Sequence, residues 1–188
     1  MEDRLQQFNQ FVEQRKASTE KLITYWHTYS DIHTWQFWFI LAMLIIPLII
    51  LYMKIDRTKI FHICFYGYTI HLFFSYMELI GINKGKIGYA YQIFPQLPSF
   101  SLDSSLIPVA FMLVYQWTLN HQKNYFLYTI VTAIIFSFLF KPFLACIGIL
   151  KLYNGFNFLD IFWVYLLALF IGKIFVSLFL KLQKPVND

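Results

Sequence analysis

Charged residues are scarce in this chain. Only 13% of its 188 residues are Asp, Glu, Lys or Arg, whereas soluble domains carry roughly a quarter. The 15 Lys and Arg outnumber the 10 Asp and Glu, but they are scattered over short connections and the tail, without a basic face or an RNA-binding motif. The chain is therefore not expected to be soluble or to bind nucleic acid, and anionic lipid is the simpler partner for its positive charge.

Cysteine and the familiar catalytic motifs are scarce or missing as well. Cys64 and Cys146 fall near opposite ends of two apolar runs, too far apart for a disulfide. G-x-S-x-G, P-loop and H-E-x-x-H patterns do not occur. His71 and Glu78 lie seven residues apart, which is too sparse for zinc with its three or four converging ligands. We expect no metal site, no cofactor and no catalytic residues; whether the protein is an enzyme stays open, with a non-catalytic role favoured.

Apolar residues make up 59% of the chain and aromatic residues 21%. Several runs are long enough to cross a bilayer of about 30 Å. The sequence predicts an all-α polytopic membrane bundle over residues 34–182, with a tail at 183–188 and five transmembrane helices at 35–53, 60–82, 105–120, 125–150 and 158–180. Pro142 interrupts the fourth run, so residues 143–150 either continue a kinked helix, which we favour, or form a re-entrant piece.

Residues 1–33 are polar but carry apolar residues at helical spacing. Leu5, Phe8, Val12, Thr19, Leu22 and Trp26 share one predicted face, and Arg15, Lys16, Glu20 and Lys21 are assigned to the other. This amphipathic helix either lies on the membrane surface or packs against the bundle or a partner. Because the segment is polar and no small-residue cleavage site follows it, we expect no signal peptide.

Several polar residues fall inside or beside the apolar runs. Counting spans places them toward one membrane side, where they predict a polar pocket covered by residues 89–100; its candidate lining residues are His71, Ser75, Glu78, Asp103, Lys141 and Asp160. The alternative is structural. In that case Glu78 and Lys141 form an ion pair that fixes the packing, Asp103 caps a helix and Asp160 begins one.

Short motifs spread over residues 33–180 resemble those of the small five-span integral membrane proteins of Bacillus- and Clostridium-type Firmicutes. The motifs are His33-Thr-Trp-Gln-Phe-Trp38, Asp56-Arg57, Glu78-Leu-Ile-Gly81, Phe94-Pro95 with Pro98, Asp103 and Pro108, Val114-Tyr-Gln-Trp117 and Lys141-Pro142. In that family's pattern Asp occupies the position of Glu78, and Glu that of Lys141. The second difference reverses a charge, which suits a Glu78–Lys141 pair. The resemblance implies the architecture and brings no assigned activity.

These observations predict a multi-pass protein of the bacterial plasma membrane that acts as a small binding, sensing or accessory subunit. Its expected partners are the lipid bilayer and either another protein or a second copy. Two alternatives remain: a proton- or solute-linked carrier in which Glu78 and His71 exchange protons, and an enzyme acting on lipid or isoprenoid with Glu78 or Asp103 as general acid. Lys54, Arg57 and Lys59, at one helix end, favour an N-terminus outside the cell.

Overall fold

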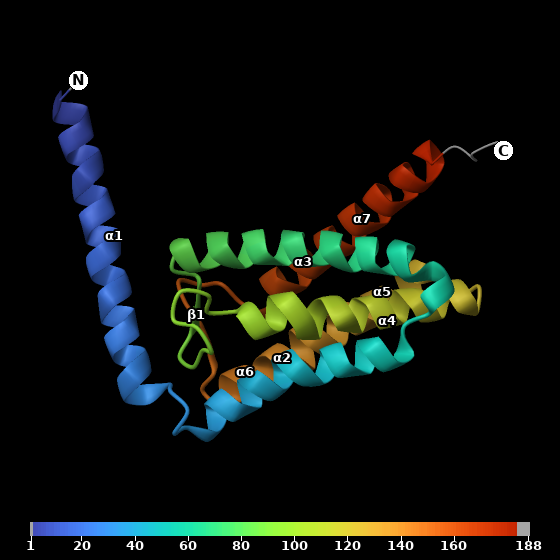
Figure 1. Ribbon diagram of the computed structural model, residues 1–188, viewed down its shortest axis with the longest axis horizontal. Helices are drawn as coiled ribbons and strands as arrows, with labels where there is room; N and C mark the ends of the chain where they lie inside the picture. The colour runs from blue at the N-terminus through green and yellow to red at the C-terminus, as the bar shows by residue number, and fades with distance from the viewer. Residues whose placement is uncertain (1, 184–188) are drawn as a thin grey trace.

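The computed structural model describes residues 2–183, which are mostly helical (Figure 1). Residues 184–188, which are most of the predicted tail, lie outside that part. The α-helices are α1 (Glu2–Tyr29), α2 (Trp35–Lys54), α3 (Ile60–Asn83), α4 (Ile107–Asn120), α5 (Tyr125–Ile135), α6 (Lys141–Cys146) and α7 (Phe158–Leu182). A short 3₁₀ turn, η1 (Arg57–Lys59), precedes α3. Asn157 caps α7, and the carboxylate of Asp160 completes its capping box.

Two of the long helices each contain one π-helical turn. The turn η2 (Leu102–Leu106) continues into α4, and η3 (Phe136–Phe140) joins α5 to α6. A proline follows each turn by two residues, Pro108 in one case and Pro142 in the other. Because proline has no N–H to donate and its ring crowds the preceding turn, the wider π-turn lets each helix continue through its proline.

The third and fourth helical runs differ from the predicted spans. The third begins at residue 100 rather than 105, so the expectation that Asp103 caps it is wrong: Asp103 lies inside the helix. The fourth passes Pro142 as expected but ends at Cys146 instead of residue 150. Gly148 stops it, because its positive φ of 77° allows Ile149 N–H to bond back to the Leu144 carbonyl, a glycine-dependent helix end.

A two-stranded antiparallel ribbon lies at one end of the bundle, and the sequence analysis did not predict it. Strand β1 (Ile87–Tyr89) pairs with β2 (Leu150–Leu152), with Ile87 opposite Leu152 and Tyr89 opposite Leu150. The ribbon ties the connection after α3 to the connection after α6. It therefore closes the end of the bundle where most of the predicted pocket residues lie.

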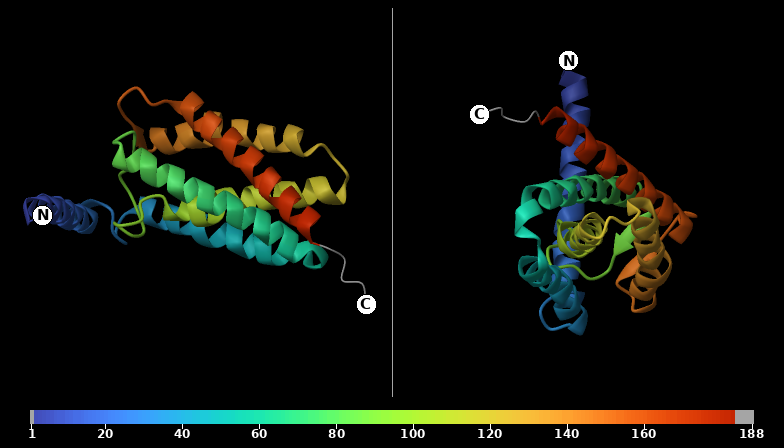
Figure 2. Two further views of the ribbon diagram at one scale, coloured as in Figure 1. Left: turned by 90° about the horizontal axis from the view of Figure 1, so that it is seen from above. Right: turned by 90° about the vertical axis from the view of Figure 1, so that its right-hand side faces the viewer.

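The bundle helices run alongside one another, whereas α1 stands across their end (Figures 1 and 2). Within residues 2–183, three helices are long and apolar enough to cross a membrane: Trp35–Lys54, Tyr125–Cys146 and Phe158–Leu182. Their outer sides expose many large apolar side chains, among them Ile46, Ile49, Leu139, Phe170 and Leu178. Large exposed apolar surfaces are rare on soluble monomers, so these side chains agree with a membrane-spanning role.

Candidate functional site

A buried ion pair joins α3 to α6. Nζ of Lys141 lies 2.8 Å from Oε1 of Glu78, and the two residues are only 1% and 7% exposed. Lys141 is the first residue after the π-turn η3, and Glu78 lies just over one turn before the end of α3. A buried charge is costly without a partner, so the contact expected between these two residues satisfies both of them.

The ribbon supplies a third member of this site, Tyr89. Its hydroxyl lies 2.8 Å from Oε1 of Glu78 and 2.8 Å from Nζ of Lys141. An ammonium group can only donate and a carboxylate can only accept. Tyr89 therefore accepts a hydrogen bond from Lys141 and donates one to Glu78, which closes a three-membered ring of hydrogen bonds.

Asp103 approaches the same region from the π-turn η2. It is 3% exposed, and one carboxylate oxygen accepts a hydrogen bond from the Ser99 hydroxyl while the other, Oδ1, has no hydrogen-bond partner among the described residues. The carboxylate lies within electrostatic range of both Glu78 and Lys141. We refer to these residues, together with Tyr165 of α7, whose hydroxyl is within electrostatic range of both carboxylates, as the acid–lysine cluster (Glu78, Tyr89, Asp103, Lys141 and Tyr165).

His71 and Ser75 lie beside this cluster, two turns and one turn before Glu78 on α3. Nδ1 of His71 lies 2.7 Å from the backbone carbonyl of Asp103. Because a carbonyl oxygen only accepts, we assign the hydrogen to Nδ1. The Ser75 hydroxyl is 3.4 Å from the same nitrogen. His71 therefore helps to position η2, Ser75 contacts His71, and neither side chain makes a hydrogen bond with Glu78 or Lys141.

A cavity of about 270 Å³ opens next to the ion pair, between α3, α7 and the ribbon. Its walls are mainly apolar, and they include Glu78 and Tyr165. Oε2 of Glu78 and the hydroxyl of Tyr165 are both buried without a hydrogen-bond partner among the described residues. The Tyr165 hydroxyl is within electrostatic range of the Glu78 and Asp103 carboxylates. Buried polar atoms without partners are uncommon and costly, so two of them in residues that line one cavity mark it as a candidate binding site.

Of the six predicted pocket residues, only Glu78 lines this cavity; His71, Ser75, Asp103 and Lys141 belong to the acid–lysine cluster or lie beside it, and the structure places Asp160 elsewhere. Its carboxylate accepts a hydrogen bond of 2.9 Å from the Asn157 backbone N–H, so it serves the start of α7. The residues that the sequence analysis missed are Tyr89 and Tyr165, which no spacing pattern distinguishes among 13 tyrosines. Within residues 2–183, no group of three or more His, Cys, Asp and Glu side chains is arranged to hold a metal ion.

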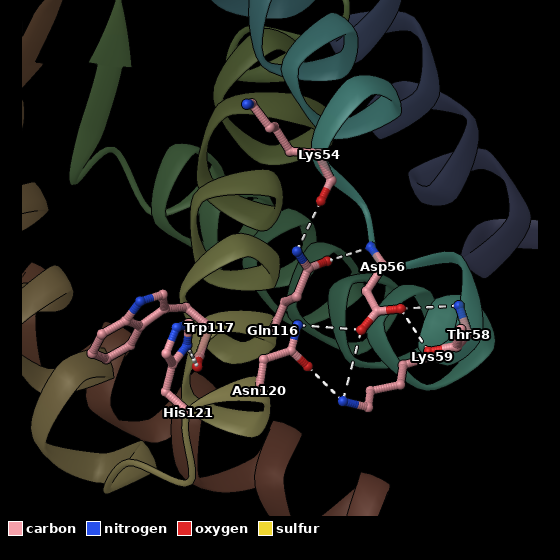
Figure 3. Close-up of polar contacts among 8 residues, drawn as sticks. All are labelled: Lys54, Asp56, Thr58, Lys59, Gln116, Trp117, Asn120 and His121. Carbon is pink, nitrogen blue, oxygen red and sulfur yellow. Dashed lines mark hydrogen bonds and ion pairs between the residues drawn. The ribbon is translucent and has the colours of Figure 1, made fainter.

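A second polar network lies at the opposite end of the bundle (Figure 3). Asp56, in the turn after α2, accepts hydrogen bonds from the N–H and hydroxyl of Thr58 at 3.0 and 2.6 Å. These bonds are the main reason that the pKa of Asp56 lies below its ordinary value. The Asn120 amide donates to the same carboxylate at 3.2 Å, and Lys59 donates to Asn120 at 2.5 Å.

Gln116 connects this network to the backbone of the α2–α3 turn. Its side-chain oxygen accepts from the Asp56 N–H at 2.8 Å, and its amide donates to the Lys54 carbonyl at 2.9 Å (Figure 3). The network therefore fixes the α2–α3 turn against the end of α4. It also brings together two of the short motifs noted in the sequence, the one containing Asp56 and the one containing Gln116.

Comparisons of this chain with models of protein families, with curated proteins and with solved structures gave no match.

Proposed function

We propose that this protein is a small binding or sensing subunit of the bacterial plasma membrane, and that its ligand binds in the cavity beside Glu78. One observation carries the proposal: two of the residues that line the cavity, Glu78 and Tyr165, each have a buried polar atom without a hydrogen-bond partner among the described residues. A largely apolar cavity with a few convergent polar groups is the usual form of a small-molecule site.

The cavity walls also define the class of ligand. A carboxylate oxygen requires a hydrogen-bond donor, and an amine satisfies it best because the bond is then charge-assisted. Phe74, Met77 and Val164 offer apolar surface to the body of the ligand. Lys84 and Lys86 line the same cavity and would attract an anionic outer group. The ligand is therefore an elongated compound with an amine at its inner end, an apolar body and an acidic outer end.

Five membrane-spanning helices are part of this proposal, as is membership of the Firmicutes family that the motifs resemble. Among residues 2–183, three helices are by themselves long and apolar enough to cross a membrane. The other two spans would be α3, with 24 residues, and the helix from residue 100 to Asn120. Both run alongside the first three in the bundle (Figure 1), which supports an alternating up-and-down path. Glu78, Asp103 and Lys141 then lie toward one membrane face, near the ribbon.

The ligand class is tested with the full-length protein in lipid nanodiscs, using its thermal midpoint as the measure of binding. The probes are ε-aminocaproate, hexylamine and hexanoate, which share one chain length. We expect ε-aminocaproate to raise the midpoint most, hexylamine less and hexanoate not at all, because a ligand that binds only the native state stabilises it. Tyr165→Phe is expected to reduce the shift, and Val164→Phe, which fills the cavity, to abolish it.

Two further variants test the amine end and the acidic end of the ligand separately. Glu78→Gln should remove the advantage of both amines over hexanoate, whereas Lys84→Met should remove only the advantage of ε-aminocaproate over hexylamine. Glu20→Gln, on the exposed surface of α1, is the matched control and should change neither. Equal shifts for all three probes, or shifts that survive Val164→Phe, would show that the cavity is not the site.

A proton-linked carrier is the second candidate, and the charge count of the cluster supports it. Glu78 and Asp103 contribute two carboxyl groups against the single ammonium of Lys141, and each carboxyl group has an oxygen without a hydrogen-bond partner in the part of the chain that the structure describes. A buried excess of negative charge favours uptake of a proton. This candidate predicts that substrate uptake into vesicles requires a pH gradient and is lost in Asp103→Asn, which should leave ε-aminocaproate binding unchanged.

A further inference from the structure

Helix α1 contacts the rest of the protein through its last turns, and these contacts show which of its sides faces the bundle. Nε1 of Trp26 donates to the Gln92 carbonyl at 2.8 Å, and the Ser30 hydroxyl accepts from the Gln92 N–H at 2.9 Å. Leu22 and Tyr25 line a hollow of about 800 Å³ shared with the ribbon. The side of α1 that carries Leu22, Tyr25 and Trp26 therefore faces the bundle end.

Helical spacing extends that side toward the N-terminus. Arg4, Phe8, Phe11 and Arg15 precede Leu22 in steps of four, three, four and seven residues, which keeps them on one side of the helix. The sequence analysis assigned Arg15 to the polar side, and its place between Phe11 and Leu22 corrects that assignment. Phe8 is 61% exposed and Phe11 is 66% exposed, so no other described part of the chain covers them.

Charge is divided between the two sides of α1. Glu13, Ala17 and Glu20 follow steps of four and three on the side facing away from the bundle. Lys16 and Lys21 lie on the flanks between the two sides. The side that faces the bundle thus combines aromatic rings with two arginines, and the carboxylates of Glu13 and Glu20 are turned away from it.

We propose that α1 lies on the bilayer surface and binds anionic lipid head groups through Arg4 and Arg15, with Phe8 and Phe11 inserted between the lipids. The proposal rests on the membrane placement proposed above. Because α1 stands across the bundle helices (Figures 1 and 2), it runs parallel to the membrane plane if those helices cross the bilayer. Its aromatic side then faces the lipid around the bundle, and its arginines reach head-group depth.

The test compares the two sides of α1 in the full-length protein. Phe8→Cys and Glu13→Cys are made separately in a Cys64→Ser, Cys146→Ser background, because both native cysteines are exposed. Each single cysteine carries an environment-sensitive fluorophore. The proteins are placed in nanodiscs of phosphatidylcholine, with and without an equal part of phosphatidylglycerol, that also contain a lipid quencher. We expect a blue shift and strong quenching at residue 8, strongest with phosphatidylglycerol, and little of either at residue 13.

The arginines are tested in the same nanodiscs. Replacing Arg4 or Arg15 by Gln should weaken surface binding about fivefold each in the presence of phosphatidylglycerol, and the loss should shrink in high salt because exposed charges are screened. Equal quenching at residues 8 and 13 would overturn the proposal. So would protection of residue 8 that follows protein concentration instead of lipid charge, which would assign this side to a second copy. If the bundle helices do not span the disc, lipid quenching of Ile49→Cys on α2 will also be absent, which identifies a failure of the membrane placement itself.

Discussion

Nζ of Lys141 lies 2.8 Å from Oε1 of Glu78, and both side chains are buried. Removing only the lysine would leave a buried carboxylate without its counter-charge, a change that costs about 3–5 kcal/mol in buried pairs. We expect Lys141→Met to lose most of its folded yield in detergent, and the double variant Glu78→Gln, Lys141→Met to recover it. Lys123→Met, at an exposed lysine in the α4–α5 turn, is the control and should fold like the parent. A double variant no better than Lys141→Met would contradict the pairing.

The Tyr89 hydroxyl bonds both partners of the ion pair. Hydrogen bonds to charged groups contribute about 1.5–3 kcal/mol, so Tyr89→Phe should lower the free energy of unfolding by about that amount. The measurement is unfolding by sodium dodecyl sulfate in mixed micelles. Tyr91→Phe is the matched control, since the Tyr91 hydroxyl makes no hydrogen bond within the described residues. A loss of equal size in both variants would show that ring packing matters and the hydroxyl does not.

Gly67 on α3 allows α4 to approach closely. A Cβ atom added there would lie 2.1 Å from Sδ of Met112, so the methionine or the helix must move. Overpacking of this kind costs about 1–3 kcal/mol, and we expect Gly67→Ala to lower the unfolding midpoint. Met112→Ala should relieve most of that loss when the two changes are combined. Independent, additive effects in the double variant would refute the predicted contact.

The turn that contains Asp56 should respond to acid. Hydrogen bonds from Thr58 lower the pKa of Asp56, so the charged carboxylate stabilises the folded turn. That stabilisation is complete above the unfolded pKa of about 3.9 and is lost as pH falls through the lower folded value. Amide hydrogen exchange at Thr58 should accelerate over that acidic range. Asp56→Asn should already exchange fast at neutral pH and show no such acid step.

The helices could largely be predicted from the sequence, because long apolar runs between polar turns have few other folds available. The predicted and observed ends of α2, α3 and α7 agree within two residues. The start of the third helical run at residue 100 was not predicted, because Pro98 suggested a loop and Asp103 suggested a helix cap. The ribbon was not predicted either, since each of its strands has three residues and is too short to show an alternation of apolar and polar residues.

The site could be predicted only where its residues contrast with their surroundings. Glu78, Asp103 and Lys141 are conspicuous because a charge in an apolar run is rare and costly. Asp160 is equally conspicuous, but its carboxylate caps the start of α7. The sequence alone does not distinguish a capping carboxylate from one that lines a pocket. Tyr89 and Tyr165 do not stand out in this way, because the chain around them is rich in aromatic residues. Only the ribbon register and the packing of α7 bring them to the ion pair.

The register of the ribbon also decides whether the Tyr89 hydroxyl can reach the ion pair. Alternate residues of a strand point to opposite faces, so a slip of one residue between β1 and β2 would turn Tyr89 away from Glu78 and Lys141. The paired strands thus hold the α3–α4 connection and the α6–α7 connection together. Pulling the α3–α4 connection away from the α6–α7 connection therefore has to break the pairing of β1 with β2 and the hydrogen bond between Tyr89 and the buried Lys141.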